Sequence, residues 1–526
     1  MSEQLDLLLV NPGGRRGTYQ GLQDADLTSI ETPIWAGLIA SFVRKHGFTA
    51  DILDANVWQL DPEDNWVYPK NKLLAIVCYG QQPSASTQTM PAAIELCKTI
   101  KRDNPQQKVI MVGGHVAALP QRTLEESGAD YVATGEGCHT ILDILQGKSI
   151  EAGDVRGIGF ITAYRGMEKP LNEHVDMYCE SHSAPNVADV NDMQIPWYDL
   201  PVEKYRAHNW QCLGGWPRTP YAALYTSLNC PFRCSFCMIS SPFKEGDLLV
   251  AKEKAAKSGL PLADEIPNIY RTWNPDTIGQ QIADLYYTKG CRTFKVADEM
   301  FVLNKRHVEG VCDAILSRIK SPGGPEGINI WAYARVDTAN DVKLLEKMRA
   351  AGFRWLCLGI ESASESVREG IDKGYAQDKI RKCVDRIRDA GIHVLANYIV
   401  GLPGDTLESM QQTLDLAIEL NTPWMNVYAS MPYPGSPMWD DYPEHHSLPW
   451  EAFSQHSRET HPTATKTLTA AQVLEFRDRF WHTYFTSPKY LTLVGDLWGQ
   501  GAVDEIKAMT GHKLHRNLLQ LQGAGV

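Results

Sequence analysis

Three cysteines in a short segment have the residue types and spacing needed for iron–sulfur chemistry. Cys230, Cys234 and Cys237 form a C-x3-C-x2-C pattern within the nine residues 229–237. Cysteine thiolates are the usual ligands of iron–sulfur clusters, and a [4Fe–4S] cluster has four irons to be ligated. Three cysteines would therefore leave one iron without a protein ligand, and that iron could bind another molecule.

Zinc and disulfide chemistry fit these cysteines less well. A structural zinc site needs four ligands, usually in two closely spaced pairs, and the chain has no second pair. The other nine cysteines stand singly, and the chain shows neither disulfide-framework spacing nor a secretory signal. The pattern therefore favours an iron–sulfur cluster. Unpaired cysteines also predict a reducing, cytoplasmic setting.

The bulk composition limits the classes of partner. The chain has 526 residues, enough for about three domains, and 43% of them are hydrophobic. Its formal net charge is −12, and it contains no run of Lys and Arg, which argues against a nucleic-acid partner. No apolar run reaches the ~18 residues of a membrane span, and the polar start at residues 1–6 does not read as a targeting peptide.

The first 150 residues alternate strand-like and helix-like segments. Helical periodicity occurs at residues 34–46, 86–103 and 122–127. The short apolar runs that predict strands are Leu5–Val10, Thr49–Leu53, Leu73–Cys78, Val109–Val112 and Tyr131–Ala133. This alternation predicts a parallel, doubly wound α/β sheet, whose ligands lie over the carboxyl ends of its strands.

A second alternating region runs from residue 220 to 440 and includes the three cysteines. Helices are predicted at residues 276–288 and 376–390, among others. The predicted strands are Tyr221–Leu228, Thr293–Ala297, Asn329–Ala334, Trp355–Ile360, His393–Val400 and Met425–Ala429. Six such units predict a partial (β/α)6 barrel with its site at the carboxyl ends of the strands.

Polar residues recur on or after the predicted barrel strands. Besides the cysteines they are Glu299, Arg335, Glu361, Ser362 and Asn397. Their shared placement favours a common ligand. An ion pair between Arg335 and Glu361 is the structural alternative.

Two regions flank the predicted barrel. Residues 151–219 are expected to be an interdomain linker, with Trp197 as a packing anchor and with Trp210 and Trp216 as further anchors. Residues 441–526 are expected to form a small helical cap, in which a helix over Thr469–Phe485 has Thr469 as its N-cap. The cluster at residues 444–446 resembles a metal-ligand set, but adjacent histidines do not share a helix face, so a solvated loop is favoured.

Residues 220–440 resemble the core of the radical S-adenosylmethionine (SAM) enzymes. The cysteine motif is that family's signature, and the phrases at 334–337, 358–362, 373–374 and 400–405 resemble its cobalamin-dependent branch. The resemblance implies a [4Fe–4S] cluster whose free iron chelates SAM. It also implies backbone near Phe236 against the adenine, Glu299 on the amino group, Arg335 on the carboxylate, and Glu361 and Ser362 on the ribose, with Asn397 in the same site. Asp298-Glu299 lacks the glycines of the Gly-Gly-Glu motif whose position it occupies.

The first 150 residues resemble the cobalamin-binding domain that precedes many radical SAM enzymes. Asn11-Pro12, Gly113-Gly114-His115 and 134–137 follow the first, fourth and fifth strands, as in that domain. The resemblance implies that the nucleotide tail is lined by Ser84, Ser86, Gly113, Gly114, Gly135 and Gly137, and that Asn11, Pro12, Gln82, His115 and Glu136 also lie at the cobalamin. The cobalt-ligating histidine motif is missing, since Asp54-Ala-Asn56 lacks the histidine. We therefore expect cobalt without a histidine beneath it, Gln81 or Gln82 near its lower face, and His115 as a satisfied turn residue.

Together these resemblances cover nearly the whole chain and imply a cobalamin-dependent radical SAM methyltransferase. In that family a 5′-deoxyadenosyl radical removes hydrogen from the substrate, methylcobalamin delivers the methyl group, and a flavodoxin or ferredoxin supplies electrons. A small-molecule substrate methylated at an unactivated carbon is expected. A radical cyclase or rearranging enzyme with the same cofactors and a non-catalytic cobalamin sensor remain alternatives. A methylthiotransferase is disfavoured, because Cys78, Cys97 and Cys138 do not look like a second cluster site.

Overall fold

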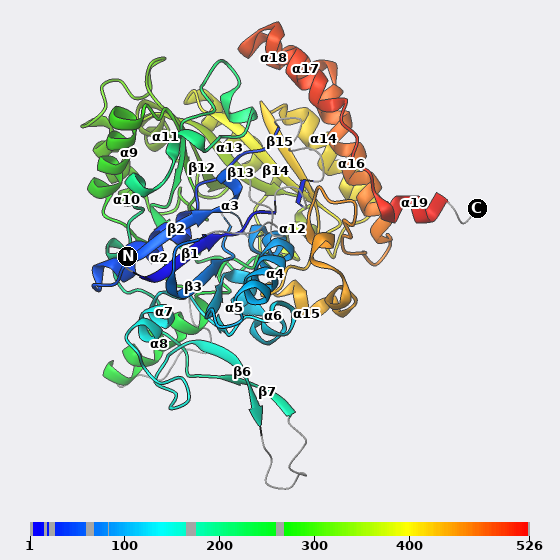
Figure 1. Cartoon of the computed structure of the whole chain (residues 1–526). Helices are drawn as coiled ribbons and strands as arrows, with labels where there is room; N and C mark the ends of the chain where they lie inside the picture. Colours follow the sequence, from blue (N-terminus) through cyan, green and yellow to red (C-terminus); the bar gives the residue numbers. More distant parts are fainter. Residues whose placement is uncertain are drawn as a thin grey trace.

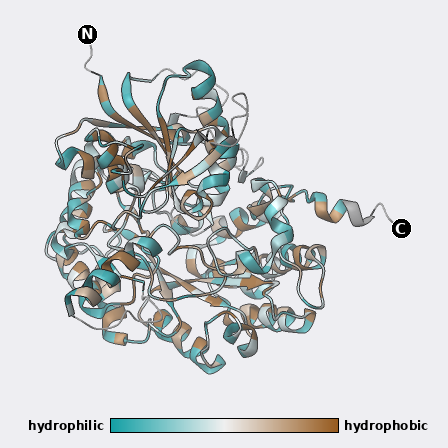
Figure 2. Ribbon diagram, turned by 90° about the horizontal axis from the view of Figure 1, so that it is seen from below, coloured by the Kyte–Doolittle hydropathy of each residue, from teal (hydrophilic) through white to brown (hydrophobic). Residues whose placement is uncertain are grey.

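The computed structural model describes residues 4–14, 18–19, 27–58, 68–80, 82, 84–164, 175–258 and 268–523. A mainly parallel sheet, a second sheet that is wholly parallel, a small two-stranded sheet and a helical C-terminal region make up this part of the chain (Figure 1). Hydrophobic residues gather on the strands, while the outer helices carry more hydrophilic residues (Figure 2). None of the described helices is long and apolar enough to cross a membrane.

The N-terminal sheet has the strand order β2-β1-β3-β4-β5-β6-β7. Its first five strands are parallel, as predicted, and are β1 (Leu5–Asn11), β2 (Ala50–Asp54), β3 (Asn71–Val77), β4 (Val109–Val112) and β5 (Tyr131–Ala133). The hairpin of β6 (Ile158–Tyr164) and β7 (Val175–Glu180) joins β5 in antiparallel pairing. Part of the predicted linker therefore extends the first sheet, and the hairpin projects from the body of the molecule (Figure 1).

Helices cover both faces of this sheet because β1 is apolar on both sides. Leu7 and Leu9 belong to one core with residues of α2 (Ile34–Lys45) and α7 (Cys138–Leu145). Leu8 and Val10 belong to a second core with α4 (Ala85–Asp103) and α6 (Pro120–Ser127). The short helices α3 (Ala55–Trp58) and α5 (Gly114–Ala118) begin directly after β2 and at the Gly-Gly turn after β4. This arrangement is the doubly wound sheet expected from the sequence.

The second sheet is parallel and has the order β15-β14-β13-β12-β11-β8. Its strands are β8 (Tyr221–Leu224), β11 (Thr293–Val296), β12 (Asn329–Arg335), β13 (Phe353–Glu361), β14 (His393–Val400) and β15 (Trp424–Ala429). The helices between them are α9 (Pro275–Lys289), α10 (Lys305–Leu316), α11 (Val342–Ala350), α12 (Glu365–Glu369), α13 (Gln377–Asp389) and α14 (Leu407–Leu420). Since β8 and β15 are the two ends of the sheet, the barrel is partial and open on one side, as predicted.

The first predicted barrel strand is shorter than expected. β8 ends at Leu224, and β9 (Ser227–Leu228) pairs in antiparallel fashion with β10 (Arg271–Thr272). Between them lies α8 (Lys244–Ser258), a helix that was not predicted from the sequence. This small sheet places the cysteine loop between β9 and α8.

Aromatic residues fill the end of the barrel opposite the cysteine loop. Trp210 lies in one of four 3-10 turns, at 190–192, 197–199, 202–204 and 210–212. Its ring centroid is 5.4 Å from that of Trp331 and 5.2 Å from that of Trp355. Both partners lie early in their strands, so Trp210 closes this end of the barrel by packing, as an aromatic anchor should.

The C-terminal region covers the open edge of the barrel. Its helices are α15 (Met438–Asp441), α16 (Ala470–Thr486), α17 (Pro488–Trp498), α18 (Gln500–Thr510) and α19 (Asn517–Gly523), with 3-10 turns at 443–447 and 450–453. Thr469 caps α16 in a capping box with Gln472, so the predicted N-cap is confirmed. Gln455 bonds to both backbone groups of Ala429 on the edge strand β15, with bonds of 3.0 and 2.8 Å. An edge strand whose backbone groups are bonded in this way is protected from further strand pairing.

The expected solvated loop at 444–446 is wrong for its central residue. His445 is 1% exposed, and its ring packs against those of Tyr442, Phe453 and His461. The aromatic neighbours of the cap bury the histidine, and local sequence did not reveal them.

Candidate active site

The three motif cysteines lie together on one loop after β9. Cys230 is buried, Cys234 and Cys237 are partly exposed, and the Cys237 N–H donates to Cys234 O at 3.0 Å. Within the described ranges, no three or more His, Cys, Asp or Glu side chains could hold one metal ion. A [4Fe–4S] cluster needs no such set, because each cysteine binds a different iron. The donor chemistry of the loop therefore fits a cluster.

Burial controls the protonation of two of the three thiols, those of Cys230 and Cys237. It raises the pKa of Cys230 to about 12 and also raises the pKa of Cys237. Without a cation the two thiols stay protonated. A metal ligand must be a thiolate, so binding of iron releases these protons.

A polar network that was not predicted from the sequence holds the cysteine loop. Asn229 adopts φ 70°, a left-handed conformation that asparagine tolerates better than most residues. Its side chain accepts from the Cys230 N–H at 2.8 Å and donates to Asp247 Oδ2 at 3.0 Å. Asn268 donates to Cys230 O at 2.8 Å. The asparagine beside the motif was a local signal for this support, whereas Asp247 lies on α8 and Asn268 lies in the loop before β10.

Glu299 leaves a carboxylate oxygen open near the cysteines. Its neighbour Asp298 is fully bonded, through Thr226 and Ser227. In contrast, Glu299 Oε2 is buried and has no hydrogen-bond partner in the described part of the chain. Burial raises the pKa of Glu299 to about 8. An unpaired buried acceptor is costly, so this oxygen fits a ligand that brings an N–H donor, such as the SAM amino group.

Arg335 extends from the end of β12 to the cysteine loop. Its Nη1 lies 3.6 Å from Cys234 Sγ, and its guanidinium lies 3.8 Å from the centre of the Phe232 ring. It is paired with Asp337 through bonds of 2.9 and 3.0 Å. These contacts place the cation beside the site where a SAM carboxylate is expected.

The alternative ion pair between Arg335 and Glu361 is wrong. Glu361 pairs instead with Lys373, which lies in the loop after α12. Glu361 also has φ 64°, which is rare for a residue other than glycine and is typical of functional sites.

The remaining predicted SAM residues lie in different surroundings. Ser362 is fully buried, where its hydroxyl lies 3.3 Å from Thr413 Oγ1 and accepts from the Ser364 N–H. Phe236 packs against a small apolar cluster that includes Ile399. Asn397 donates to Cys357 Sγ at 3.0 Å within the barrel. Roles for these residues in binding SAM stay predictions.

A cavity of about 750 Å³ lies between the N-terminal sheet, the barrel and the C-terminal helices. From the first sheet it is lined by Asn11, Pro12, Gly13, Gly14, Gly80, Gln82 and Ser84. From the barrel it is lined by Lys295, Tyr333, Cys357, Asn397 and Asn426, and from α16 by Arg477, Asp478, Trp481 and His482. Because the cavity opens over the carboxyl ends of β1 and β3, it fits a corrin bound at that edge.

Four of the predicted cobalamin residues, Asn11, Pro12, Gln82 and Ser84, line this cavity. Gln81 lies outside the described residues. The others, Ser86, Gly113, Gly114, His115, Gly135, Glu136 and Gly137, are not among its lining residues. Several of these contact the barrel: a Cβ placed on Gly114 would lie 3.1 Å from Met238 Cε, and Ser241 Oγ donates to Gly114 O at 3.3 Å. Their place at the nucleotide tail stays a prediction.

His115 is enclosed by protein. It is 1% exposed, its Nδ1 lies 3.3 Å from Thr87 Oγ1, and its ring meets Trp450 edge-on at 4.4 Å. Burial lowers the pKa of His115 to about 3. Neutral and packed in this way, it has the surroundings of a satisfied core histidine.

Two ion pairs between the domains, one of them buried on both sides, were not predicted either. Glu136 bonds to Arg271 of β10 at 2.9 Å, and Glu31, before α2, lies 3.8 Å from Lys295 of β11. Burial raises the pKa of Glu31, but Lys295 and His208 more than offset this and bring it to about 2. These contacts join residues more than 130 positions apart, so no local pattern could identify them.

Comparisons with known proteins find family matches over both of the sheet-containing regions. Residues 24–145 match the B12 binding domain, and residues 224–417 match the radical SAM superfamily. An uncharacterized methyltransferase of Pyrococcus horikoshii is 28% identical over 361 residues, covering 68% of each chain. An anaerobic magnesium-protoporphyrin IX monomethyl ester cyclase of Cereibacter sphaeroides is 22% identical, over 79% of this chain and 61% of the relative. The methyltransferase TsrM of Kitasatospora setae, solved with cobalamin and a [4Fe–4S] cluster, shares the fold with a TM-score of 0.58 at 16% identity, over 84% of this chain and 75% of TsrM.

Proposed function

Because the chain is a radical SAM enzyme that carries a B12-binding domain, we propose that it methylates an unactivated carbon of a small molecule. When bound, the cluster with SAM supplies hydrogen-atom abstraction, and cobalamin supplies the methyl group. In this proposal Cys230, Cys234 and Cys237 hold the cluster, and Glu299 and Arg335 hold SAM. The cobalamin lies over Asn11, Pro12, Gln82 and Ser84.

The observation that carries the proposal is the cavity of about 750 Å³, which runs from the strand ends of the N-terminal sheet into the barrel. A methyl donor over the first sheet would face this space. Of the predicted SAM residues only Asn397 lines it, so a radical source would reach this space through the barrel interior near Asn397. Binding of a substrate between them would bring the reacting groups together, and such positioning provides much of enzymatic rate enhancement. Trp210 and residues of α16 form part of the wall of this cavity.

The chain's own residues would position the cofactors while the cofactors carry the difficult chemistry. The Asn229 and Asp247 network fixes the cysteine loop. Glu299 accepts from the SAM amino group, and Arg335 neutralises its carboxylate. We expect an external one-electron donor, such as flavodoxin or ferredoxin, to reduce the cluster in the cytoplasm.

A cyclase or rearranging reaction is the second candidate, and similarity to the ester cyclase favours it. The test is incubation of the anaerobic holoenzyme with SAM labelled in its methyl group and with candidate substrates. Label in the product supports methylation. Turnover with 5′-deoxyadenosine formation but without label in the product would replace methylation by the second candidate.

A cobalamin sensor would behave differently from both enzymes. Such a protein would bind cobalamin without cleaving SAM at all. Formation of 5′-deoxyadenosine by the unchanged protein, lost in a Cys234→Ala variant, separates an enzyme from a sensor.

A further inference from the structure

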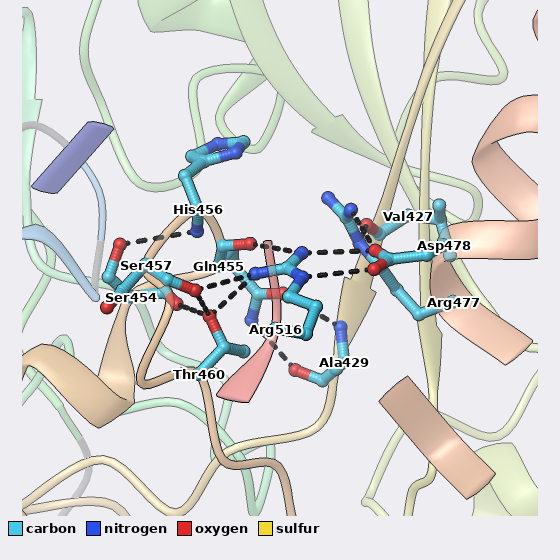
Figure 3. A network of polar contacts seen from close by, with 10 residues as sticks. All are labelled: Val427, Ala429, Ser454, Gln455, His456, Ser457, Thr460, Arg477, Asp478 and Arg516. Carbon is cyan, nitrogen blue, oxygen red and sulfur yellow. Dashed lines mark hydrogen bonds and ion pairs between the residues drawn. The ribbon is translucent and has the colours of Figure 1, made fainter. Parts of the chain in front are cut away.

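One end of the cavity is basic, and the proposed roles of the cofactors do not use it. Arg477 on α16 is 6% exposed and lines the cavity. Its Nε donates to Val427 O at 3.0 Å, and its Nη1 donates to Asp478 Oδ1 at 2.8 Å (Figure 3). Within the part of the chain that the structure describes, no acceptor for Nη2 is found. One arm of this buried guanidinium is therefore left for a ligand.

The charges at this end do not balance. Arg516 lies on the other side of the Asp478 carboxylate from Arg477 and also binds it, with bonds of 3.0 Å to each carboxylate oxygen (Figure 3). Among the described residues, Asp478 is the only carboxylate bonded to either guanidinium. Two cations thus share one anion, which leaves one positive charge in a buried region. An uncompensated buried charge is costly, so a bound anion would stabilise this end of the cavity.

The neighbouring side chains do not supply that anion. His456 lines the cavity, and its Nδ1 is buried without a hydrogen-bond partner in the described ranges. Burial, reinforced by Arg477 and Arg516, lowers the pKa of His456 to about 3, so the ring is neutral. Trp481 and His482, one helical turn after Arg477 and Asp478, also line the cavity. The basic end therefore has an aromatic wall and the neutral His456 beside the open arm of Arg477.

We propose that the substrate is an anion and that Arg477 binds its carboxylate or phosphate group. The proposal rests on the proposed function, because it takes this cavity to be the substrate site. Both groups present paired oxygens to a guanidinium, which binds them better than an ammonium does. His456 Nδ1 supplies a second polar contact, and Trp481 contacts the body of the substrate.

The test uses three probes that share one aromatic body: 1-naphthylacetate, 1-naphthyl phosphate and the uncharged 1-naphthylacetamide. Saturation-transfer NMR measures their dissociation constants for the anaerobic holoenzyme. We expect at least one anionic probe to bind about tenfold or more tightly than the amide, as a charge-assisted hydrogen bond would give. A preference for the acetate indicates a carboxylate substrate, and a preference for the phosphate ester indicates a phosphate.

Variants connect this preference to Arg477. We expect Arg477→Gln to bind the three probes within about twofold of one another, and Arg477→Lys to keep part of the preference. Arg381→Gln is the matched control, because Arg381 is exposed and pairs with Glu419 on the outside of the barrel. Far-UV circular dichroism, iron content and cobalamin content establish that each variant is folded and loaded.

Equal binding of the probes to the unchanged enzyme, or binding of none, would overturn the proposal. An undiminished preference for the anionic probes in folded Arg477→Gln would also overturn it. Loss of cobalamin from that variant, with the preference retained, would overturn it as well. If Arg477→Gln does not fold, a preference kept in part or in full by Arg477→Lys supports the role of the positive charge, and an absent preference in that variant counts against it. The measurement reads binding, so its failure leaves methyl transfer untouched, and an enzyme that prefers anions but transfers no methyl group would refute only the methylation.

Discussion

Replacing Arg271 by alanine should loosen the contact between the N-terminal sheet and the small sheet of β9 and β10. Arg271 of β10 and Glu136 after β5 form a buried pair, with side chains 8% and 2% exposed. Arg271 Nη1 also donates to Val187 O at 2.7 Å, and the Val187 N–H donates to Glu136 Oε2 at 2.6 Å. The alanine variant would leave the Glu136 carboxylate buried without its cation. Breaking a buried pair from one side costs about 3–5 kcal/mol.

Hydrogen–deuterium exchange measures this loss directly. If the contact opens by local unfolding, 3–5 kcal/mol corresponds to exchange that is faster by about a hundredfold to several thousandfold. Peptides that contain Val187 or β10 should show this change, because the Val187 amide is bonded to Glu136 itself. Peptides from α13, on the far side of the barrel, should not change.

Two further variants make the reasoning refutable. Arg381→Ala removes an exposed pair whose side chains are 40% and 52% exposed, so it should cost less than about 1 kcal/mol. A double variant, Glu136→Gln with Arg271→Met, removes both charges and should recover most of the protection. Exchange in Arg271→Ala within about threefold of the unchanged protein would show that the pair does not hold the domains.

Three other predictions concern the cofactor sites and the first sheet. Cys234→Ala should lose the [4Fe–4S] absorbance and all SAM cleavage, whereas Cys383→Ala, far from the loop, should keep both; a Cys234→Ala protein that still makes 5′-deoxyadenosine would refute the cluster assignment. Glu299→Gln should weaken SAM binding by about tenfold or more, because the bound ammonium group of SAM would ionise Glu299 and the variant has no carboxylate to pair with it, as measured by anaerobic equilibrium dialysis; an unchanged dissociation constant would remove Glu299 from the site. The pKa of His115 is about 3 in the folded protein and 6.5 for an ordinary histidine, as in the unfolded chain. Its contribution to stability is therefore complete above pH 6.5 and is lost as the pH falls toward 3, because only the unfolded chain takes up the proton in this range. Urea unfolding should show that lowering the pH from 7 to 5.5 destabilises the unchanged protein by about 1 kcal/mol more than His115→Gln, and equal losses would contradict the burial argument.

The two sheets could be predicted because their signals are local. The segments at β4, β5 and β14 are short apolar runs bounded by glycine, proline or polar residues, and the structure gives them the predicted bounds. The β6 and β7 hairpin was missed because its pairing reverses the direction of the sheet. Nothing in the repeated alternation of strand and helix signals such a reversal.

The candidate site divides in the same way. Cys230 and Glu299 follow their strands directly, so position along the chain was enough to select them. The ion-pair partners of Arg335 and Glu361 were not predictable. Arg335 pairs with Asp337 and Glu361 pairs with Lys373, and these pairings depend on how the loops after β12 and α12 fold. The same holds for Arg477: its helix was expected, but the face that meets the cavity depends on how α16 docks on β15.

The contact of Met238 and Ser241 with the Gly-Gly turn has a consequence for protein engineering. The segment that follows the cysteine loop packs on the Gly-Gly turn of the first sheet. The B12-binding domain and the barrel therefore share this contact surface. A chimera that joins this barrel to the B12-binding domain of a relative would have to carry residues 238–243 together with the matching turn at Gly113–Gly114. A B12-binding domain that is exchanged between relatives should therefore be transferred together with the segment that follows the cysteine motif, and not cut at the boundary between the sheets.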